Sequence, residues 1–477
     1  MEAIPNKAVK PLRPFGAKDK WSYAMGDFGC NMSFALNSYL MLFYTQYIGL
    51  SLTTWGVIIL LLKIWDGIND PIMGGLMDSL KPGKRGKFKS YIYFGSFLLI
   101  VSGAMCFLPI PNAPYWVKVL VCVVGYLVWD MSYTIVNVPY GAMNAAISAD
   151  PTERAQLSTY RSLGAFLANI AIMVALPLFC YDQNNNLLGN RLFIIALIMG
   201  VAAFFAFQIL LKGTVERVQV KEDAADRPKY NYWQAMASFF KNRAAVGTTI
   251  AAMASLIMMS GLASATQILF QSFFQNAQMS GVISFISYLP MLIIIPLIKP
   301  IVKRFGKKEA STYPLLVGMV AALLMAVLPI QPNMSGLIVW IVLSVVVSFS
   351  FSIFAMVGWA MVADCIDYQE LKTGRREEGT VYATYSLGRK LAQGFGASII
   401  AFLLMLTGYI SENGAHQTVE VANNIRQMIG YVYLGGLVLM FVFLQWVYNL
   451  DKKAVADMEA ALGRNNSELV GQTAEED

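Results

Sequence analysis

Long apolar segments recur along the whole chain of 477 residues, and they constrain its fold more than any other feature. Each segment has about 20 residues or more, enough for a helix to cross the hydrocarbon core of a bilayer. Hydrophobic residues make up 57% of the chain and charged residues only 14%, whereas soluble proteins carry about a quarter charged residues. The sequence therefore predicts an all-α membrane protein with many spanning helices.

Twelve apolar segments are predicted, and one polar stretch divides them into two sets of six. They cover residues 21–48, 53–78, 90–110, 115–148, 158–181, 190–212, 244–274, 279–300, 311–330, 335–363, 381–410 and 427–449. The expected organisation has five parts: an N-terminal tail (1–20), a six-helix bundle (21–212), a linker (213–243), a second six-helix bundle (244–449) and a C-terminal tail (450–477).

Lysine and arginine residues concentrate in alternate loops, which predicts the orientation of the chain. They gather in the N-terminal tail, in KPGKRGKFK, in the 213–243 linker and in KPIVKRFGKKE. Because cytoplasmic loops carry an excess of these residues, we expect both termini to be cytoplasmic and the chain to lie in the cell membrane (inner or plasma). The same bias accounts for the net charge of +7, so the basic charge does not indicate a nucleic-acid partner.

The sequence shows no pattern typical of an enzyme. The five cysteines have neither CxxC nor Cys/His metal spacing, and the single histidine, His416, lies in a polar loop. No nucleophile–base set is recognisable. We therefore expect no catalytic residues and no cofactor.

Ionisable residues inside the predicted spans point to an internal network. There are eight, four acidic and four basic: Asp27, Lys63, Asp66, Asp70, Asp130, Arg161, Arg389 and Lys390. Charged groups facing hydrocarbon are costly and usually face a cavity or a partner instead. Their balance favours paired groups in the interior; pairs that only stabilise helix packing are the alternative.

The stretch KIWDGINDPIMG, residues 63–74, holds the densest group. In a helix, Asp66, Asn69 and Asp70 occupy positions i, i+3 and i+4 on one face. Two carboxylates and an amide carbonyl supply hard oxygen ligands that suit Na⁺, or protons if only the carboxylates act. A salt-bridge cluster with Lys63 is the alternative interpretation.

Two other spans carry polar residues at mid-depth. In WDMSYTIVNVPYG, Tyr133 and Asn137 offer an aromatic face and hydrogen-bonding groups suited to a sugar, although helix–helix packing by polar residues explains them as well. Thr134 can share a cavity with Asp66. In segment 381–410, Lys390 is a natural counter-charge for the carboxylates of segment 53–78.

Four stretches, taken together, resemble one transporter family. KIWDGINDPIMGGLMD, GKRGKFK, YTIVNVPYG and MVADCIDYQELKTGRREEG occur in this order, and the sequence is similar to the glycoside–pentoside–hexuronide:cation symporters over roughly residues 20–450. Melibiose permease and permeases for xylosides and glucuronides belong to that family. The resemblance, with the two parallel six-helix repeats, implies the major facilitator fold.

The resemblance implies a cation site and a sugar site. The cation site, which permits Na⁺, falls on Asp66, Asn69, Asp70 and Thr134. The expected sugar-binding residues are Asn31, Asp66, Asp70, Tyr133, Asn137, Arg161 and Lys390. Asn137 and Asn31 (or Cys30) stand where melibiose permease has aspartates, and Gly141 and Ala355 stand where it has tryptophans, so the identity of the sugar stays open.

The expected function is import of a sugar or glycoside together with Na⁺ or H⁺ by alternating access, by a protein that acts as a monomer in the bilayer. Salt bridges that hold one state closed on the cytoplasmic side are expected to involve Arg154, Asp364, Asp367, Glu370 and Arg375. A carrier for a non-sugar solute is the alternative within the fold. A membrane sensor that binds sugar without moving it is a further alternative.

Overall fold

A computed structural model describes residues 13–79, 88–148, 150–217, 239–374 and 378–462. Within these ranges every regular element is a helix, and the one β-bridge, Tyr181 to Leu187, is isolated. Ten of the described helices are long and apolar enough to cross a membrane. The predicted all-α class is therefore confirmed.

The helices follow the predicted apolar segments closely. Before the linker they are α1 (Ala17–Phe34), α2 (Asn37–Leu42), the π-helix η1 (Phe43–Tyr47), α3 (Leu52–Ser79), α4 (Lys89–Cys106), α5 (Tyr115–Ile147), α6 (Pro151–Cys180) and α7 (Gly189–Gly213). After it come α9 (Arg243–Leu256), η3 (Ile257–Gly261), α10 (Leu262–Ser272), α11 (Met279–Phe305), α12 (Lys307–Val327), α13 (Met334–Thr373), α14 (Glu378–Leu406), η4 (Ser411–Asn413), α15 (Val419–Val442), η5 (Phe443–Val447) and α16 (Lys452–Ala461).

Contacts between residues divide the chain into two compact units. Unit 1 comprises Met1–Leu40, Ile68–Ile172 and Gly189–Asp226, and unit 2 comprises Met41–Gly67, Met173–Leu188 and Arg227–Asp477. Helices α3 and α6 each contribute to both units. The six-helix bundles expected from the sequence are a different division of the chain, and they stay a prediction.

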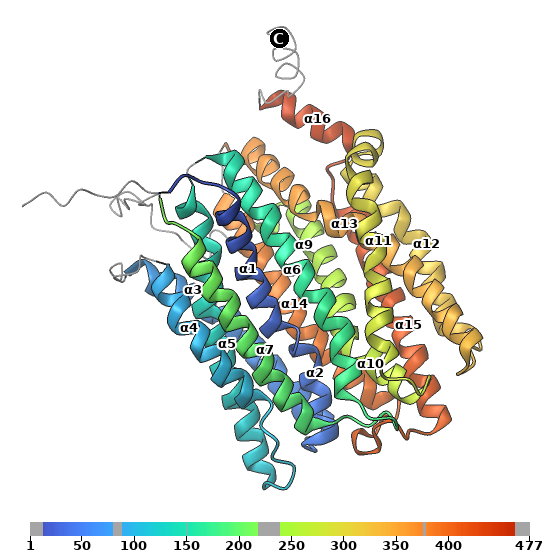
Figure 1. The fold of residues 1–477 in the computed structure, drawn as a ribbon. Helices are drawn as coiled ribbons and strands as arrows, with labels where there is room; N and C mark the ends of the chain where they lie inside the picture. The colour runs from blue at the N-terminus through green and yellow to red at the C-terminus, as the bar shows by residue number, and fades with distance from the viewer. Residues whose placement is uncertain (1–12, 80–87, 149, 218–238, 375–377, 463–477) are drawn as a thin grey trace, which may run out of the picture. The chain divides into compact units, whose positions relative to one another are not determined.

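In unit 1, α4 packs along both α5 and α7, and α1 packs along α7 (Figure 1). Small residues allow such close approach between membrane helices. A Cβ at Gly164 of α6 would collide with the backbone carbonyl of Ala24 in α1, so this position requires glycine. The Lys89 ammonium donates to the carbonyls of Leu211 at 2.9 Å and Thr214 at 2.5 Å, which satisfies carbonyls at the end of α7.

In unit 2, α12 packs against both α13 and α15. A Cβ at Gly430 of α15 would lie 2.6 Å from the backbone nitrogen of Ala326 in α12, so the two helices meet closely there. Arg426, one turn earlier on α15, is 1% exposed and donates to the carbonyls of Met325 at 2.5 Å and Ala326 at 3.5 Å. Arg426 therefore caps the C-terminal end of α12.

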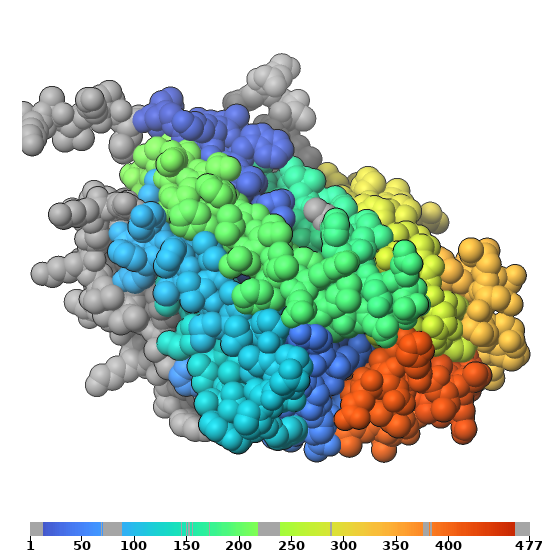
Figure 2. Space-filling model, turned by 60° about the horizontal axis from the view of Figure 1, so that its bottom comes forward, coloured from blue at the N-terminus to red at the C-terminus, as the bar shows by residue number. Residues whose placement is uncertain are grey.

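Large apolar side chains stay exposed on the outer surface of several helices. On α7, green in Figure 2, this surface includes Ile194, Ile198, Phe205 and Ile209. A contiguous exposed apolar surface on a helix of this length is typical of contact with lipid.

Candidate functional site

Asp66 lies between two lysines in unit 2. The Lys63 ammonium is 3.3 Å from Asp66 Oδ2, and the Lys390 ammonium is 3.5 Å from Oδ1. Helix α14 approaches α3 closely because Gly394 has no side chain: a Cβ there would collide with Lys63. The Ser398 hydroxyl also donates to the Gly56 carbonyl at 2.9 Å. The packing of α14 on α3 thus places Lys390 beside the carboxylate.

In unit 1, α3 contributes Asn69 to a second polar group. The Asn69 amide donates to Asp130 Oδ2 and to Thr134 Oγ1, both at 3.2 Å. All three side chains are buried. Asp130 and Thr134 are one turn apart on α5, so their side chains lie on the same face. A carboxylate, a hydroxyl and an amide offer the hard oxygens that alkali cations prefer.

The four residues of the expected cation site have different surroundings. Asn69 and Thr134 are brought together, and Asp66 pairs with the lysines. The side chain of Asp70 lies outside the described residues. Among the residues that the structure describes, no group of three or more histidine, cysteine, aspartate or glutamate side chains could hold a metal ion.

Asp27 of α1 and Arg161 of α6 form an ion pair in unit 1. Arg161 Nε donates to Asp27 Oδ1 at 3.1 Å, and the guanidinium lies over the Tyr140 ring, 5.0 Å from its centroid. The Asn31 amide donates to the Asp27 carbonyl at 2.8 Å and to Oδ2 at 3.4 Å. Asn169 of α6 donates to Asn31 Oδ1 at 2.9 Å. These four polar side chains form a continuous network, here named the Asp27–Arg161 network.

The expected sugar residues of α5 lie near the same helices. The Cys30 thiol is 3.8 Å from Asn137 Oδ1, which it reaches as a weak donor. Cys30 is buried, whereas Asn31 belongs to the Asp27–Arg161 network. The Tyr133 ring stacks on Trp129, with centroids 5.6 Å apart.

The surface of α6 separates polar from apolar side chains. One side of α6 exposes the polar side chains of Ser158, Ser162 and Asn169, and Arg161 lies at the border of that side. The other side exposes Leu163 and Leu167. Spacings of four and seven residues place the three polar side chains on one face. Polar groups within a membrane span face water or protein rather than hydrocarbon, so this face is suited to an aqueous path.

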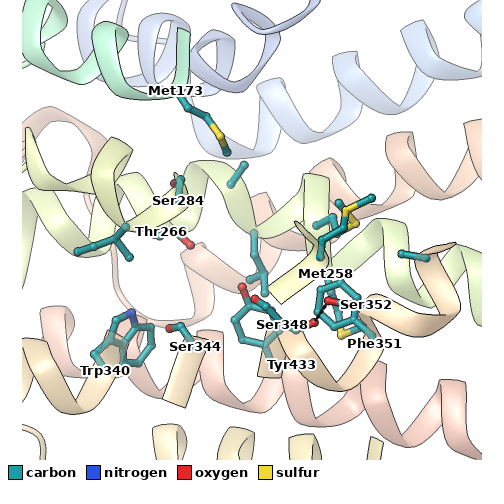
Figure 3. Close-up of a pocket in the computed structure, with 16 residues that line it drawn as sticks. Met173, Met258, Thr266, Ser284, Trp340, Ser344, Ser348, Phe351, Ser352 and Tyr433 are labelled. Atoms are coloured by element: carbon teal, nitrogen blue, oxygen red, sulfur yellow. Dashed lines mark hydrogen bonds between the residues drawn. The ribbon is translucent and has the colours of Figure 1, made fainter. Parts of the chain in front are cut away.

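Unit 2 contains a separate pocket of about 150 Å³. Figure 3 shows the hydroxyl groups of Ser344, Ser348 and Ser352 by the rings of Trp340, Tyr433 and Phe351, with Thr266 and Ser284 on the side of Met173. Mixed apolar and hydroxyl linings are typical of small-molecule sites, and a cavity of about this volume holds one benzene ring. Ala355, which stands at one of the expected tryptophan positions, also lines the pocket.

Two of the residues expected to form salt bridges on the cytoplasmic side, Asp364 and Arg154, have bonding partners within their own units. Asp364 of α13 accepts hydrogen bonds from the Lys307 ammonium at 2.6 and 2.8 Å, within unit 2. Arg154 Nε donates to the Ser148 carbonyl at 2.8 Å, within unit 1. Asp367 and Glu370 lie on the last turns of α13, and Arg375 lies outside the described residues.

Several residues of these groups were not predicted as site residues. The sequence marks Asp27 and Asp130 only as ionisable groups in spans, although Asp130 precedes Thr134 by four residues, a spacing that places both on one helix face. Asn169 follows Ser162 by seven residues, so the polar face of α6 is visible in the sequence. Nothing in the sequence singles out Lys307, which lies 57 residues from Asp364.

Comparisons with known proteins point to a transport protein and to a fold already seen in transporters. A family model described as MFS/sugar transport protein matches residues 22–452. The chain is 29% identical to the isoprimeverose transporter of Lactiplantibacillus pentosus, over 94% of this chain and 92% of that protein. It is 28% identical to the glucuronide carrier protein homolog of Escherichia coli (strain K12), over 90% and 92%. The crystal structure of the nucleoside transporter NupG aligns with 90% of this chain and 98% of its own, at a TM-score of 0.63 and 13% identity, which shows a shared fold.

Proposed function

The chain belongs to the MFS/sugar transport protein family, whose model spans residues 22–452, and we propose that it imports a sugar or glycoside together with a cation. Membership in this family, with an all-helical fold shared with major facilitator transporters, makes the chain a multi-pass membrane transporter and not an enzyme. It also agrees with the predicted relationship to the glycoside–pentoside–hexuronide:cation symporters.

The single observation that carries the sugar assignment is the Asp27–Arg161 network. It brings a carboxylate, a guanidinium and two amides from α1 and α6 together. Sugar hydroxyls both donate and accept hydrogen bonds, so they match a guanidinium that donates and amides that do both. Relatives named for isoprimeverose and for a glucuronide support the same substrate class.

We propose that the coupling cation, Na⁺ or H⁺, acts at the carboxylates of α3 and α5. Asp66, beside two lysines, and Asp130, beside Asn69 and Thr134, are the described carboxylates that support this proposal. Each positive charge moved inward down 100 mV contributes about 2.3 kcal/mol, or about fifty-fold accumulation of the coupled sugar. We further propose that both termini are cytoplasmic, because the basic loops lie on their side.

Transport by purified protein in proteoliposomes tests the proposal. Uptake of a panel of labelled glycosides is measured with an inward Na⁺ gradient, with an inward H⁺ gradient and with neither. We expect at least one glycoside to accumulate above equilibrium with one of the two gradients. Equal uptake under all three conditions would contradict cation coupling, and no saturable uptake of any glycoside would contradict sugar transport.

A less polar solute is the second candidate substrate. The pocket of unit 2 favours it, because its lining combines methionines and aromatic rings with hydroxyl groups and carries no charged side chain among the lining residues that the structure describes. Competition in the same proteoliposomes distinguishes a glycoside substrate from a less polar one. The less polar candidate would be favoured if apolar aromatic alcohols were themselves accumulated and inhibited glycoside uptake only weakly.

A further inference from the structure

The geometry of Arg161 leaves part of its guanidinium available to a ligand. Nε is engaged by Asp27 Oδ1, and Asp27 is its one acidic partner among the residues that the structure describes. Among the described residues, the hydrogen bond to this carboxylate comes from Nε and not from the terminal nitrogens Nη1 and Nη2, while the Tyr23 hydroxyl also lies within hydrogen-bonding reach of the guanidinium. Gly141, 3.8 Å from Nη1 at the position of a Cβ, has no side chain to cover that nitrogen. The Arg161 side chain is 38% exposed, against 13% for Asp27.

Asp27 is positioned by its neighbours rather than by the arginine alone. The Asn31 amide, on the same helix, donates a hydrogen bond to the Asp27 carboxylate, and the Asn169 amide of α6 donates one to Asn31. The Tyr140 ring covers one face of the guanidinium. The network thus contains one negative charge, one positive charge and neutral amides, so its net charge is zero.

We propose that Asp27 sets the charge preference of the sugar site, so that the carrier takes uncharged glycosides in preference to hexuronides. The inference rests on the proposed function. A guanidinium is well matched to a carboxylate ligand, but here Asp27 already neutralises it. A sugar carboxylate at Nη1 and Nη2 would add a second negative charge beside Asp27, which is unfavourable. Vicinal hydroxyls accept hydrogen bonds from the same two nitrogens without that repulsion.

Asp27 acts in this proposal as a positioning residue and a counter-charge, not as a ligand of the sugar. Removing its charge while keeping its shape should leave Arg161 uncompensated and able to pair with an anionic sugar. The Asp27→Asn variant is the direct test, since the amide occupies the same space. Asp27→Glu keeps the charge and serves as the conservative control. The double variant with Arg161→Gln restores a neutral network.

The probes are methyl glucoside and methyl glucuronide, which share a ring and differ in whether C6 is an alcohol or a carboxylate. Binding of both anomers is measured on purified protein by thermal shift and calorimetry. We expect wild-type protein to favour the glucoside, and Asp27→Asn to move the ratio of the two affinities toward the glucuronide by at least about tenfold. Asp27→Glu and the double variant should not show this shift.

The outcomes separate the inference from the function on which it rests. An unchanged ratio in folded Asp27→Asn would overturn the role of Asp27, even if transport itself is confirmed. A wild-type preference for the glucuronide overturns it as well, without any variant, which covers the case that Asp27→Asn does not fold. Glycoside panels that neither bind nor are transported would instead reject the sugar-carrier function.

Discussion

Gln46 and Gln271 exchange two hydrogen bonds through their side-chain amides, at 2.8 and 3.1 Å. Gln46 also donates to the Tyr409 hydroxyl at 2.7 Å, and Gln271 donates to the Asn185 carbonyl at 2.8 Å. The four residues come from all three segments of unit 2, with Gln271 and Tyr409 both in the segment Arg227–Asp477. Gln46 and Asn185 belong to the first predicted bundle, and Gln271 and Tyr409 belong to the second. If the bundles rock against each other, these bonds must break.

Replacing Gln46 with leucine should loosen this contact. Gln271 is 0% exposed, and a buried amide that loses its partner costs about 1–3 kcal/mol. Ser272, the residue after Gln271, is also buried. A cysteine introduced at Ser272 should therefore react faster with a thiol reagent when Gln46 is replaced by leucine than when Gln46 is present. The five native cysteines are buried and should contribute little.

Ser51→Ala is the matched control for that experiment, because the Ser51 hydroxyl caps the start of α3 through its bonds to Thr54. Its labelling rate should equal that of the parent. Equal rates for Gln46→Leu and the parent would show that the glutamine pair does not hold this region closed.

Asp66→Cys should abolish cation-driven accumulation while leaving expression near normal. The substitution removes the carboxylate that lies beside Lys63 and Lys390, while both lysines keep their positive charge, which disfavours an incoming cation. Uptake with and without a cation gradient in vesicles measures the effect. Na⁺-driven accumulation by this variant would refute the assignment of Asp66 to coupling.

Thr134→Val should weaken the response to the coupling cation by about tenfold, since one hydrogen-bonding contact to a charged group contributes about 1.5 kcal/mol or more. The substitution keeps the shape of the side chain and removes the oxygen next to Asn69. The measurement is the cation concentration that gives half-maximal uptake at saturating sugar.

Ser132→Ala is the control on the same helix, because its hydroxyl donates to the Val128 carbonyl of its own helix at 2.6 Å. It should leave the half-maximal cation concentration unchanged. A comparable change in both variants would indicate a general disturbance of α5 instead of the loss of a cation ligand.

Arg426→Gln should lower thermal stability without changing the sugar preference. Arg426 caps the last turn of α12 through two carbonyls and also donates to Asn423 at 2.9 Å. Losing these bonds leaves buried carbonyls without a donor, at a cost of about 1–3 kcal/mol. The melting temperature of purified protein measures this, with Arg243→Gln as the control, since Arg243 makes an exposed bond to the Trp446 carbonyl. If Arg426→Gln melted at the same temperature as the wild-type protein, Arg426 would have no capping role.

Helix positions could be predicted because the cause is local. The length of an apolar run relative to bilayer thickness requires a helix, since backbone groups have no other partner in lipid. The break between α1 and α2, at Ala35 and Leu36, was not anticipated within segment 21–48. The π-helical turn η3 within segment 244–274 was not anticipated either, because apolar content does not distinguish one helical hydrogen-bond pattern from another.

The sequence by itself determined the class, the helices and the faces on which Asp66 and Asn69 lie, because hydropathy and helical periodicity are properties of neighbouring residues. Only the tertiary structure decided which charges meet. Arg161 pairs with Asp27 across 134 residues, and Asn69 meets Asp130 across 61. Such pairings depend on how whole helices pack, with glycines such as Gly394 and Gly164 setting the closest approach. Periodicity predicts the face of a residue, and packing selects its partner.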